Sequence, residues 1–382
     1  MMEFRPFLHH ERALPELGVS VAYWGGGIDE TNVDLAVEAE KMGYSCIWAS
    51  EAYSSDANTI LAWIGARTSH IGLGAAVLQI PARSPAMTGM IATTLDRLSD
   101  GRFRLGLGVS GPQVSEGWHG VPFTRPLQRT REYVDIVRHV VAGDTLTFHG
   151  SSYQIPIPGG PGKPLRLAHP PLRHDIPIYL GAVGQASLEL TGAIADGWLA
   201  AFFDPDSAAT ELSALGRGRK TSPDPERPLA ITPMVPFAID DDIEAAARRV
   251  APYCALYIGG MGSRERNVYA LKASRLGYER EVRQVQQHFL SRDYRKAAAA
   301  VPFELIDATS AIGPAERLVS RLRRFGQGGA TEVALVPMAP STNLRLDLLR
   351  HLAAAVSLEA PTNSPDGIRN LGRAGDGQRT AR

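Results

Sequence analysis

The chain has 382 residues, of which 44% are hydrophobic and 21% are charged, enough for one large core or for two domains. Forty basic and forty acidic residues cancel, which argues against nucleic acid or an anionic membrane as a partner. The two cysteines, Cys46 and Cys254, lie far apart and predict neither a disulfide framework nor a thiolate metal site. We expect a cytoplasmic location, because we find no secretory leader and no run of about 18 apolar residues.

Short apolar runs alternate with amphipathic ones in the first part of the chain. Proline at position 85 fits the first turn of a helix, where its missing N–H is tolerated. Nearly continuous apolar strands separated by helices predict a parallel sheet covered by helices. The expected strands are 17–24, 45–50, 70–80 and 101–110, and the expected helices are 30–43, 56–68, 84–100 and 126–143.

The same alternation resumes after a proline-rich connection at about 144–176. Further strands are expected near 176–181 and at 198–202, 229–239 and 331–338, which brings the total to eight. Eight strands alternating with helices predict an α/β fold of the (β/α)₈ TIM barrel type. We expect one barrel domain over 1–357, with insertions at about 144–176 and 243–311. The second insertion is helical and precedes the last strand, and a disordered tail follows at 358–382.

The stretch "LGLGVSGPQVSEGWHG" contains Gly106-x-Gly108-x-x-Gly111, the pattern of a dinucleotide-binding turn. That fingerprint belongs to a first strand–helix unit, with a helix starting at the third glycine. Here three such units come first, and the glycines and prolines after Gly111 prevent an immediate long helix. We interpret the glycines as a close backbone approach at the carboxyl end of the fourth strand, where a barrel carries its active site.

Four stretches occur in the order and spacing of a known family. They are "ASEAYSSDANTILAWIGART", "IGLGAAVLQIPARSPA", "LDRLSDGRFRLGLGVSGP" and "IPIYLGAVGQASLELTGAIADGW". Within most of residues 17–356 the chain resembles the luciferase-like monooxygenase superfamily, whose members bind FMN or the deazaflavin coenzyme F420 in a (β/α)₈ barrel. The stretches "RPLQRTREYVDIVR" and "APYCALYIGGMG" resemble its deazaflavin-dependent branch most.

The resemblance implies positions for the cofactor. A non-prolyl cis peptide at Ala76–Val77 would support the face of the ring, and Gln79 would meet the ring edge. The fourth strand would border the cofactor with Ser110, Gly111 and Gln113, and the second strand with Ser50 and Glu51. The phosphate would lie at a helix start, where free N–H groups attract anions; that start comprises Gly181, Ala182, Val183, Gly184 and Gln185.

Two titratable side chains are candidate catalytic residues. Glu51 follows the second strand and is interpreted as a catalytic or ring-contacting carboxylate, with a solvated loop acid as the alternative. His119 is either a general acid or an ordinary hydrogen-bonded loop histidine. Sugar dehydrogenases of the superfamily have histidine at the position of Glu51 and a glutamate after the strand-4 glycines, so sugar dehydrogenation is not expected here.

Three aromatic residues, Trp24, Tyr53 and Trp118, are candidates for lining a substrate pocket, although any barrel mouth would bury such rings. Glu116 and the strand-starting residues Arg102 and Arg104 are interpreted as structural. The spacing of His, Asp and Glu predicts no metal site.

The resulting functional hypothesis is an F420-dependent oxidoreductase. It would transfer a hydride between the deazaflavin and a small organic substrate with a carbonyl group or an activated double bond, with the reduced cofactor as donor. An FMN-dependent monooxygenase fed by a separate reductase and a non-catalytic flavin-binding barrel are the alternatives. We also expect a homodimer, because "TILAWIGA" and "MTGMIATTL" carry more apolar residues than one buried face requires.

Overall fold

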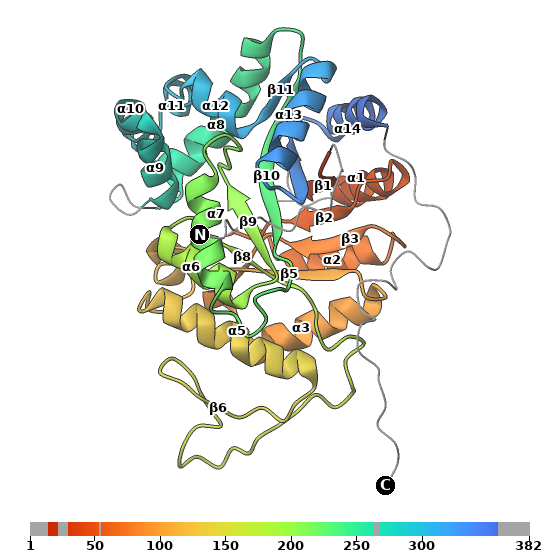
Figure 1. Ribbon diagram of the computed structural model, residues 1–382, viewed down its shortest axis with the longest axis vertical. Helices are drawn as coiled ribbons and strands as arrows, with labels where there is room; N and C mark the ends of the chain where they lie inside the picture. The colour runs from red at the N-terminus through yellow and green to blue at the C-terminus, as the bar shows by residue number, and fades with distance from the viewer. Residues whose placement is uncertain (1–13, 22–29, 53–54, 263–266, 358–382) are drawn as a thin grey trace.

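Eight parallel strands form a closed barrel in the computed structural model, which describes residues 14–21, 30–52, 55–262 and 267–357 (Figure 1). Around the barrel the strands follow the order β12-β1-β2-β3-β5-β8-β9-β10, and β10 pairs with β12 to close it. The predicted (β/α)₈ barrel is therefore confirmed, whereas Trp24, Tyr53 and the expected tail lie outside the described residues. The strands are β1 (Glu16–Val21), β2 (Cys46–Ala49), β3 (Gly72–Ala75), β5 (Phe103–Gly108), β8 (Ile178–Gly181), β9 (Gly197–Ala201), β10 (Ala230–Ile239) and β12 (Glu332–Pro337).

Helices surround the barrel, and their ends follow local sequence rules. Asp56 and Ser84 cap two of them by accepting the N–H groups of Thr59 and Met87, and Gly143 ends another with φ 82°. None of the helices in the described ranges is long and apolar enough to cross a membrane. The surrounding helices are α1 (Glu30–Lys41), α2 (Ala57–Gly65), α3 (Pro85–Leu98), α5 (Pro126–Ala142), α6 (Gln185–Ile194), α7 (Ala209–Arg219), α13 (Ala315–Gln327) and α14 (Thr342–Val356).

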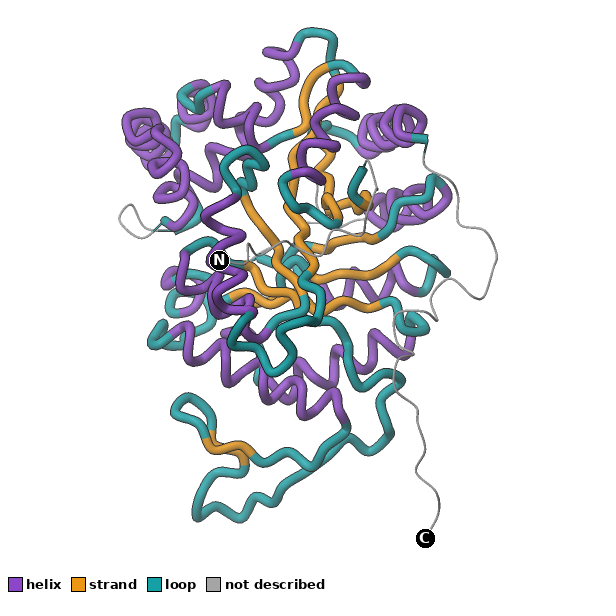
Figure 2. The backbone as a smooth tube through the Cα atoms, viewed as in Figure 1, coloured by secondary structure: helices purple, strands orange, loops and turns teal. Residues whose placement is uncertain are grey.

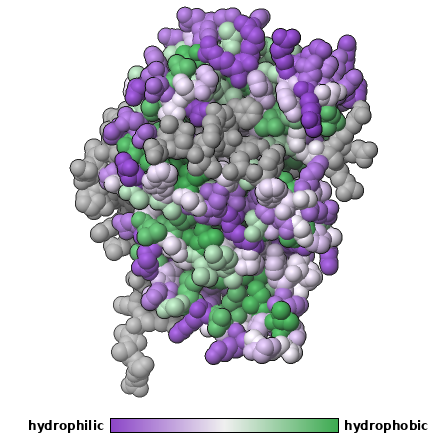
Figure 3. Space-filling model, turned by 180° about the vertical axis from the view of Figure 1, so that it is seen from behind, coloured by the Kyte–Doolittle hydropathy of each residue, from purple (hydrophilic) through white to green (hydrophobic). Residues whose placement is uncertain are grey.

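A group of helices lies between β10 and the last barrel strand, at the upper left of Figure 1. The predicted helical insertion before the last strand is therefore present. It ends in a short extra strand, β11 (Ala311–Gly313), which pairs with the end of β10 outside the barrel. Seen from behind, the surface of this upper part is mainly hydrophilic, whereas apolar side chains gather lower down (Figure 3). The inserted helices are α8 (Ile243–Gly260), α9 (Val268–Ala273), the π-helix η2 (Ser274–Tyr278), α10 (Glu279–Leu290), α11 (Tyr294–Ala299) and α12 (Phe303–Thr309).

Residues 144–175, here called the arm, extend below α5 as a long loop (Figure 2). The arm contains one hairpin, formed by β6 (Phe148–His149) and β7 (Gln154–Ile155). The carboxylate of Glu132 on α5 accepts the backbone N–H groups of residues 151–153 at 2.8–3.1 Å. Hydrogen bonds from these residues and from Gln128 lower the pKa of Glu132 to about 2. One buried carboxylate therefore anchors the arm to the barrel.

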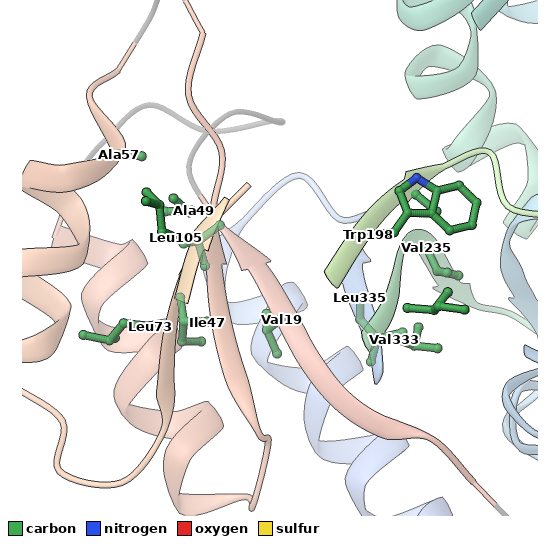
Figure 4. Close-up of a cluster of buried hydrophobic side chains, with 14 of the residues drawn as sticks. Val19, Ile47, Ala49, Ala57, Leu73, Leu105, Trp198, Val235, Val333 and Leu335 are labelled. Carbon is green, nitrogen blue, oxygen red and sulfur yellow. The ribbon is translucent and has the colours of Figure 1, made fainter. Parts of the chain in front are cut away.

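The core has two layers because strand side chains alternate between two faces. On β2, Ile47 and Ala49 pack outward against the helices, whereas Cys46 and Trp48 point into the barrel. Complete burial of each large apolar side chain contributes about 1.5–3 kcal/mol. Figure 4 shows outward-packing residues from neighbouring strands, among them Val19, Ile47, Leu73, Leu105, Val333 and Leu335.

The amino-terminal end of the barrel interior is filled by a polar network around Glu332. Its carboxylate accepts hydrogen bonds from Arg104 at 2.6 Å, from the Ser45 hydroxyl at 2.8 Å and from the Trp48 indole at 3.2 Å. The Arg104 guanidinium also lies 5.8 Å from the centre of the Trp48 ring. A Cβ at Gly74 would come within 2.3 Å of Trp48, so glycine is needed there. These contacts support the structural interpretation of Arg104.

Candidate functional site

The carboxyl ends of the eight strands form the barrel mouth, and two residues there have strained backbones. Ser110 after β5 has φ 59°, and Phe202 after β9 has φ 49°. Non-glycine residues in this left-handed region cost about 1–3 kcal/mol each and tend to gather at functional sites. Both positions therefore indicate that the barrel mouth is a candidate functional site.

A bulge connects β3 to the two-residue strand β4 (Leu78–Gln79) on one side of the mouth. The Ala76–Val77 peptide is cis, as the resemblance implied. A Cβ at Gly108 would lie 2.5 Å from Val77, and one at Gly106 would lie 1.9 Å from the Ala75 carbonyl oxygen. Two glycines of the G-x-G-x-x-G pattern therefore let β5 pack against this bulge. The Rossmann interpretation of that pattern is excluded by the fold.

The third glycine of the pattern is not crowded by the described residues. A Cβ at Gly111 would meet the side-chain oxygen of Gln113 at 3.6 Å, an ordinary van der Waals contact. Gly111 is the N-cap of the four-residue helix α4 (Pro112–Ser115), and Gln113 is exposed. Ser110, Gly111 and Gln113 thus border the mouth beside the bulge, and their contact with a cofactor remains a prediction.

The next loop along the barrel leads from β8 into α6. Gly184 is the N-cap of α6 without a side-chain cap within the described chain, and Gln185 and Ala186 are exposed. Among the described residues, the atom nearest to a Cβ at Gly184 would be the Ser187 hydroxyl at 3.7 Å, and the φ of −81° at Gly184 suits any residue. Glycine here therefore keeps space open in front of the first helical N–H groups, as a bound anion requires.

Glu51 lies at the end of β2 and forms a bidentate ion pair with Arg83. The two hydrogen bonds measure 2.7 and 3.0 Å, and Arg83 also contacts Asp56 at 2.5 Å. Only 6% of the Glu51 side chain is exposed. Burial raises the pKa of Glu51 above its usual range, and the hydrogen bonds and charge of Arg83 oppose that effect. Glu51 is therefore a buried carboxylate whose position is fixed by Arg83, so the interpretation as a solvated loop acid was wrong.

His119 contacts Gln79, the residue expected at the ring edge. Its Nε2 atom lies 2.7 Å from the Gln79 side-chain oxygen. Burial and the nearby positive charge of Arg83 lower the pKa of His119. The sequence separation of Gln79 and His119 gave no sign of this contact. Both belong to the same corner of the mouth as the cis bulge.

Trp118 and Glu116 lie in the loop after α4. The Trp118 side chain is 66% exposed, and it does not belong to the described lining of the mouth cavity. Its assignment to the substrate remains a prediction. The Glu116 carboxylate accepts the N–H of Phe123 at 2.9 Å, a contact within the loop that fits its structural interpretation.

A cavity occupies the opposite side of the mouth, where β10, β12, β1 and β2 end. Of the predicted cofactor residues it includes Ser50. Sequence reasoning missed Tyr253 and Tyr257, which the inserted helix α8 contributes; their spacing of four residues on a helix was the available signal. The lining comprises Ser20, Val21, Asn32, Leu35, Ser50, Met234, Tyr253, Tyr257, Val336, Pro337 and Arg345.

The described part of the chain contains no group of three or more His, Cys, Asp or Glu side chains placed to hold a metal ion. The mouth instead offers a glycine-lined bulge, an open helix start and a buried ion pair around one arc. The second arc offers hydroxyl groups and aromatic rings. This arrangement fits an organic cofactor beside an organic substrate.

Comparison with known proteins agrees with this description. The family model of the luciferase-like monooxygenases matches residues 25–332. A Mycobacterium tuberculosis protein, provisionally named a coenzyme F420-dependent oxidoreductase, is 40% identical over 348 residues, covering 89% of this chain and 99% of the relative. This chain belongs to the luciferase-like monooxygenase family.

Solved structures share the fold at low sequence identity. The coenzyme F420-dependent tetrahydromethanopterin reductase of Methanopyrus kandleri has a TM-score of 0.74 and 22% identity, covering 88% of this chain and 97% of that one. The oxygenating constituent of 3,6-diketocamphane monooxygenase from Pseudomonas putida, in complex with FMN, has a TM-score of 0.63 and 17% identity, with coverages of 91% and 98%.

Proposed function

We propose that the protein is an F420-dependent oxidoreductase that transfers a hydride between the deazaflavin and a small organic substrate with a carbonyl group or an activated double bond. The observation that carries the proposal is the continuous arc formed by the close packing of Gly106 and Gly108 on the β3–β4 bulge, the Gly111 position and the start of α6, which has no side-chain cap within the described chain. The name of the M. tuberculosis relative favours F420 over FMN.

Different residues of this arc would bind different parts of the cofactor. Val77 would support the face of the ring, and Gln79, fixed by His119, would meet its edge. The exposed N–H groups at the start of α6 would hold the phosphate, because the helix dipole favours an anion there. When bound, a deazaflavin supplies a two-electron hydride donor or acceptor. The protein then has to align the reactants and keep water out.

Glu51 is the residue we propose for proton transfer. Hydride addition to a carbonyl carbon or an activated double bond leaves a negative charge that must be protonated, and a positioned acid contributes about 10²–10⁴-fold. Burial raises the pKa of Glu51, whereas the ion pair with Arg83 orients the side chain and opposes that rise. In the opposite direction of the reaction, the same group would accept the proton.

Titration of the apoprotein with F420 and with FMN tests the cofactor assignment directly. We expect much tighter binding of F420, measured by quenching of its fluorescence. Preferential binding of FMN would instead favour a monooxygenase fed by a separate reductase, an alternative supported by the shared fold of the FMN-bound Pseudomonas protein. Binding of neither cofactor would point to a non-catalytic barrel.

We further propose a cytoplasmic homodimer formed through α2 and α3. These helices expose Trp63, Met87, Met90 and Leu98, of which Leu98 is 71% accessible. A row of large apolar side chains on adjacent helices is typical of an interface between subunits. Light scattering at micromolar concentration is expected to give twice the monomer mass, and a monomer would refute this interface.

A further inference from the structure

One guanidinium at the barrel mouth is shared by two carboxylates. The Nη2 group of Arg83 donates to Glu51 Oε1 at 2.7 Å and to Asp56 Oδ1 at 2.5 Å, and Nη1 donates to Glu51 Oε2 at 3.0 Å. Glu51 follows β2, Asp56 is the N-cap of α2, and Arg83 lies between the 3₁₀ helix η1 (Ile80–Ala82) and α3. Arg83 therefore ties both ends of the connection from β2 to α2 to the next connection of the barrel.

The surroundings of Asp56 favour its charged form. Its Oδ2 atom accepts the N–H and the hydroxyl group of Thr59 at 2.9 and 2.6 Å, which caps α2, and its Oδ1 atom accepts the Asn58 amide at 3.0 Å. The positive end of the helix dipole also stabilises an anion there. Burial by itself would raise the pKa of Asp56, but the hydrogen bonds from Thr59 and the charge of Arg83 outweigh burial and lower it. Asp56 therefore stays ionised.

The surroundings of Glu51 favour its neutral form. Burial is the largest influence on the pKa of Glu51 and raises it, and the negative charge of Asp56 adds to the rise. The hydrogen bonds and charge of Arg83 and the backbone N–H of Gln79 act in the opposite direction. One guanidinium cannot neutralise two carboxylates, so a proton on the more buried of the two relieves the excess negative charge. Two carboxyl groups in unlike surroundings thus take different protonation states.

The other groups around the cluster carry no negative charge. The Tyr133 hydroxyl group on α5 donates to the Arg83 carbonyl at 3.3 Å, and burial raises the pKa of Tyr133, so this group stays neutral. His119 lies close enough for the charge of Arg83 to lower its pKa, and histidine is never an anion. Of these neighbours, Asp56 is therefore the anion that competes with Glu51 for Arg83.

We propose that Asp56 is a positioning residue that acts on Glu51 through Arg83. By binding part of the guanidinium, Asp56 keeps Glu51 as the member of the cluster that holds the exchangeable proton. This proposal rests on the proposed function, in which Glu51 protonates the substrate after hydride addition. In that step the O–H bond of Glu51 breaks, the proton forms a bond to the substrate, and Glu51 becomes a carboxylate paired with Arg83. Asp56 and Arg83 keep their charges throughout.

Asp56→Asn tests the proposal in the apoprotein. Asparagine has nearly the same shape and is an equally good N-cap, so the substitution removes the charge and retains the cap. Without that charge Arg83 acts on Glu51 alone, and the Glu51 carboxyl group should titrate at lower pH than in the wild type. Carbon-13 NMR of protein labelled at the glutamate side-chain carboxyl carbon measures this titration, and the Glu51 signal is assigned by its loss in Glu51→Gln. An unchanged titration of Glu51 would overturn the proposal.

Asp242→Asn is the matched control. Asp242 is the N-cap of α8, where it accepts the Glu244 N–H at 2.9 Å and pairs with Arg248 at 3.2 Å. The control removes the same charge from the same kind of cap, and the titration of Glu51 should stay as in the wild type. If Asp56→Asn fails to fold, Asp56→Ser, another neutral N-cap, replaces it with the same expected shift. An equal shift in Asp242→Asn would assign the effect to net charge and contradict the proposal.

The F420-loaded enzyme gives a second readout. Wild-type reduction is expected to slow as the pH rises through the pKa of Glu51, and in Asp56→Asn this decline should begin at lower pH with unchanged F420 affinity. If the titration of Glu51 shifts but F420 does not bind, the positioning role stands and the proposed function is refuted. If F420 supports turnover but the titration of Glu51 does not shift, the proposed function stands and the positioning role is refuted.

Discussion

The two ends of the barrel use charged residues in opposite ways. At the amino-terminal end, Glu332 satisfies three donors at once, and its neighbours fill the interior. At the carboxyl end, Glu51 and Arg83 are paired beside open glycine positions and an uncapped helix. In the first arrangement the polar groups are already paired with one another. In the second, the N–H groups at the helix start are not capped by a side chain of the described chain and can contact a ligand. The contrast separates residues that stabilise this barrel from residues that we expect to act on its ligands.

The largest effect on stability is expected from Glu332→Ala. The substitution leaves Arg104 and the Trp48 indole without their shared acceptor inside the barrel, and breaking such a pair costs about 3–5 kcal/mol. Urea denaturation should show this loss, while cofactor affinity of the folded protein stays unchanged. Glu244→Ala, at an exposed position on α8, is the control and should change stability by less than about 0.5 kcal/mol. Equal midpoints for both variants would show that the network is dispensable.

Gly184→Asp should weaken cofactor binding without lowering the stability of the fold. A carboxylate at the start of α6 repels the proposed phosphate, and such a juxtaposition costs several kcal/mol, or about 100-fold in affinity. Aspartate is also a good N-cap, so thermal stability should stay equal or rise. Gly162→Asp, in the arm, is the matched control and should bind F420 normally. Unchanged F420 affinity in folded Gly184→Asp would assign the phosphate to another loop.

Glu51→Gln distinguishes a proton donor from a ring contact. If Glu51 is the acid, turnover should fall by about two orders of magnitude while F420 affinity changes little. Because its pKa is raised, wild-type reduction should slow as the pH increases through that pKa, and the variant should lack this limb. Weaker F420 binding with normal saturated turnover would instead assign Glu51 to holding the ring.

The smallest effect is expected from His119→Ala. Loss of one hydrogen bond to Gln79 costs about 1 kcal/mol, which corresponds to roughly fivefold weaker F420 binding. Because burial and the charge of Arg83 lower the pKa of His119, any change in wild-type affinity that follows its protonation should be centred below pH 6.5. A change centred above pH 6.5 would show that another group controls binding.

The barrel was predictable from the sequence because each strand–helix unit has its own local sequence signals. Apolar runs mark the strands, and caps such as Asp56 and Ser84 mark the helix starts. The family resemblance also gave the position of the cis peptide at Ala76–Val77, which the structure confirms. Local periodicity thus sufficed for the scaffold, and a specific motif sufficed for the position of the cis peptide, whereas the cofactor contacts of this region remain a prediction.

Contacts between distant segments could not be predicted in the same way. Arg83 reaches Glu51 across 32 positions, and no spacing rule links two loops of different strands. Tyr253 and Tyr257 occur in a stretch whose sequence is typical of a buried core helix. The fold, and not the local sequence, places α8 beside the mouth. Single-residue assignments such as Trp118 depend on side-chain direction, which a loop sequence does not specify.

The anchor at Glu132 has a practical consequence for engineering. Its acceptor bonds to residues 151–153, together with the Leu146–Leu165 backbone bond of 2.8 Å, fix both sides of the arm. The tip between them carries Gly159, at φ 72° with open space around its missing Cβ. A peptide tag or an immobilisation handle inserted after Gly159 would therefore extend an exposed loop without disturbing either fixed side of the arm. The pKa of about 2 keeps the Glu132 anchor ionised in any ordinary buffer.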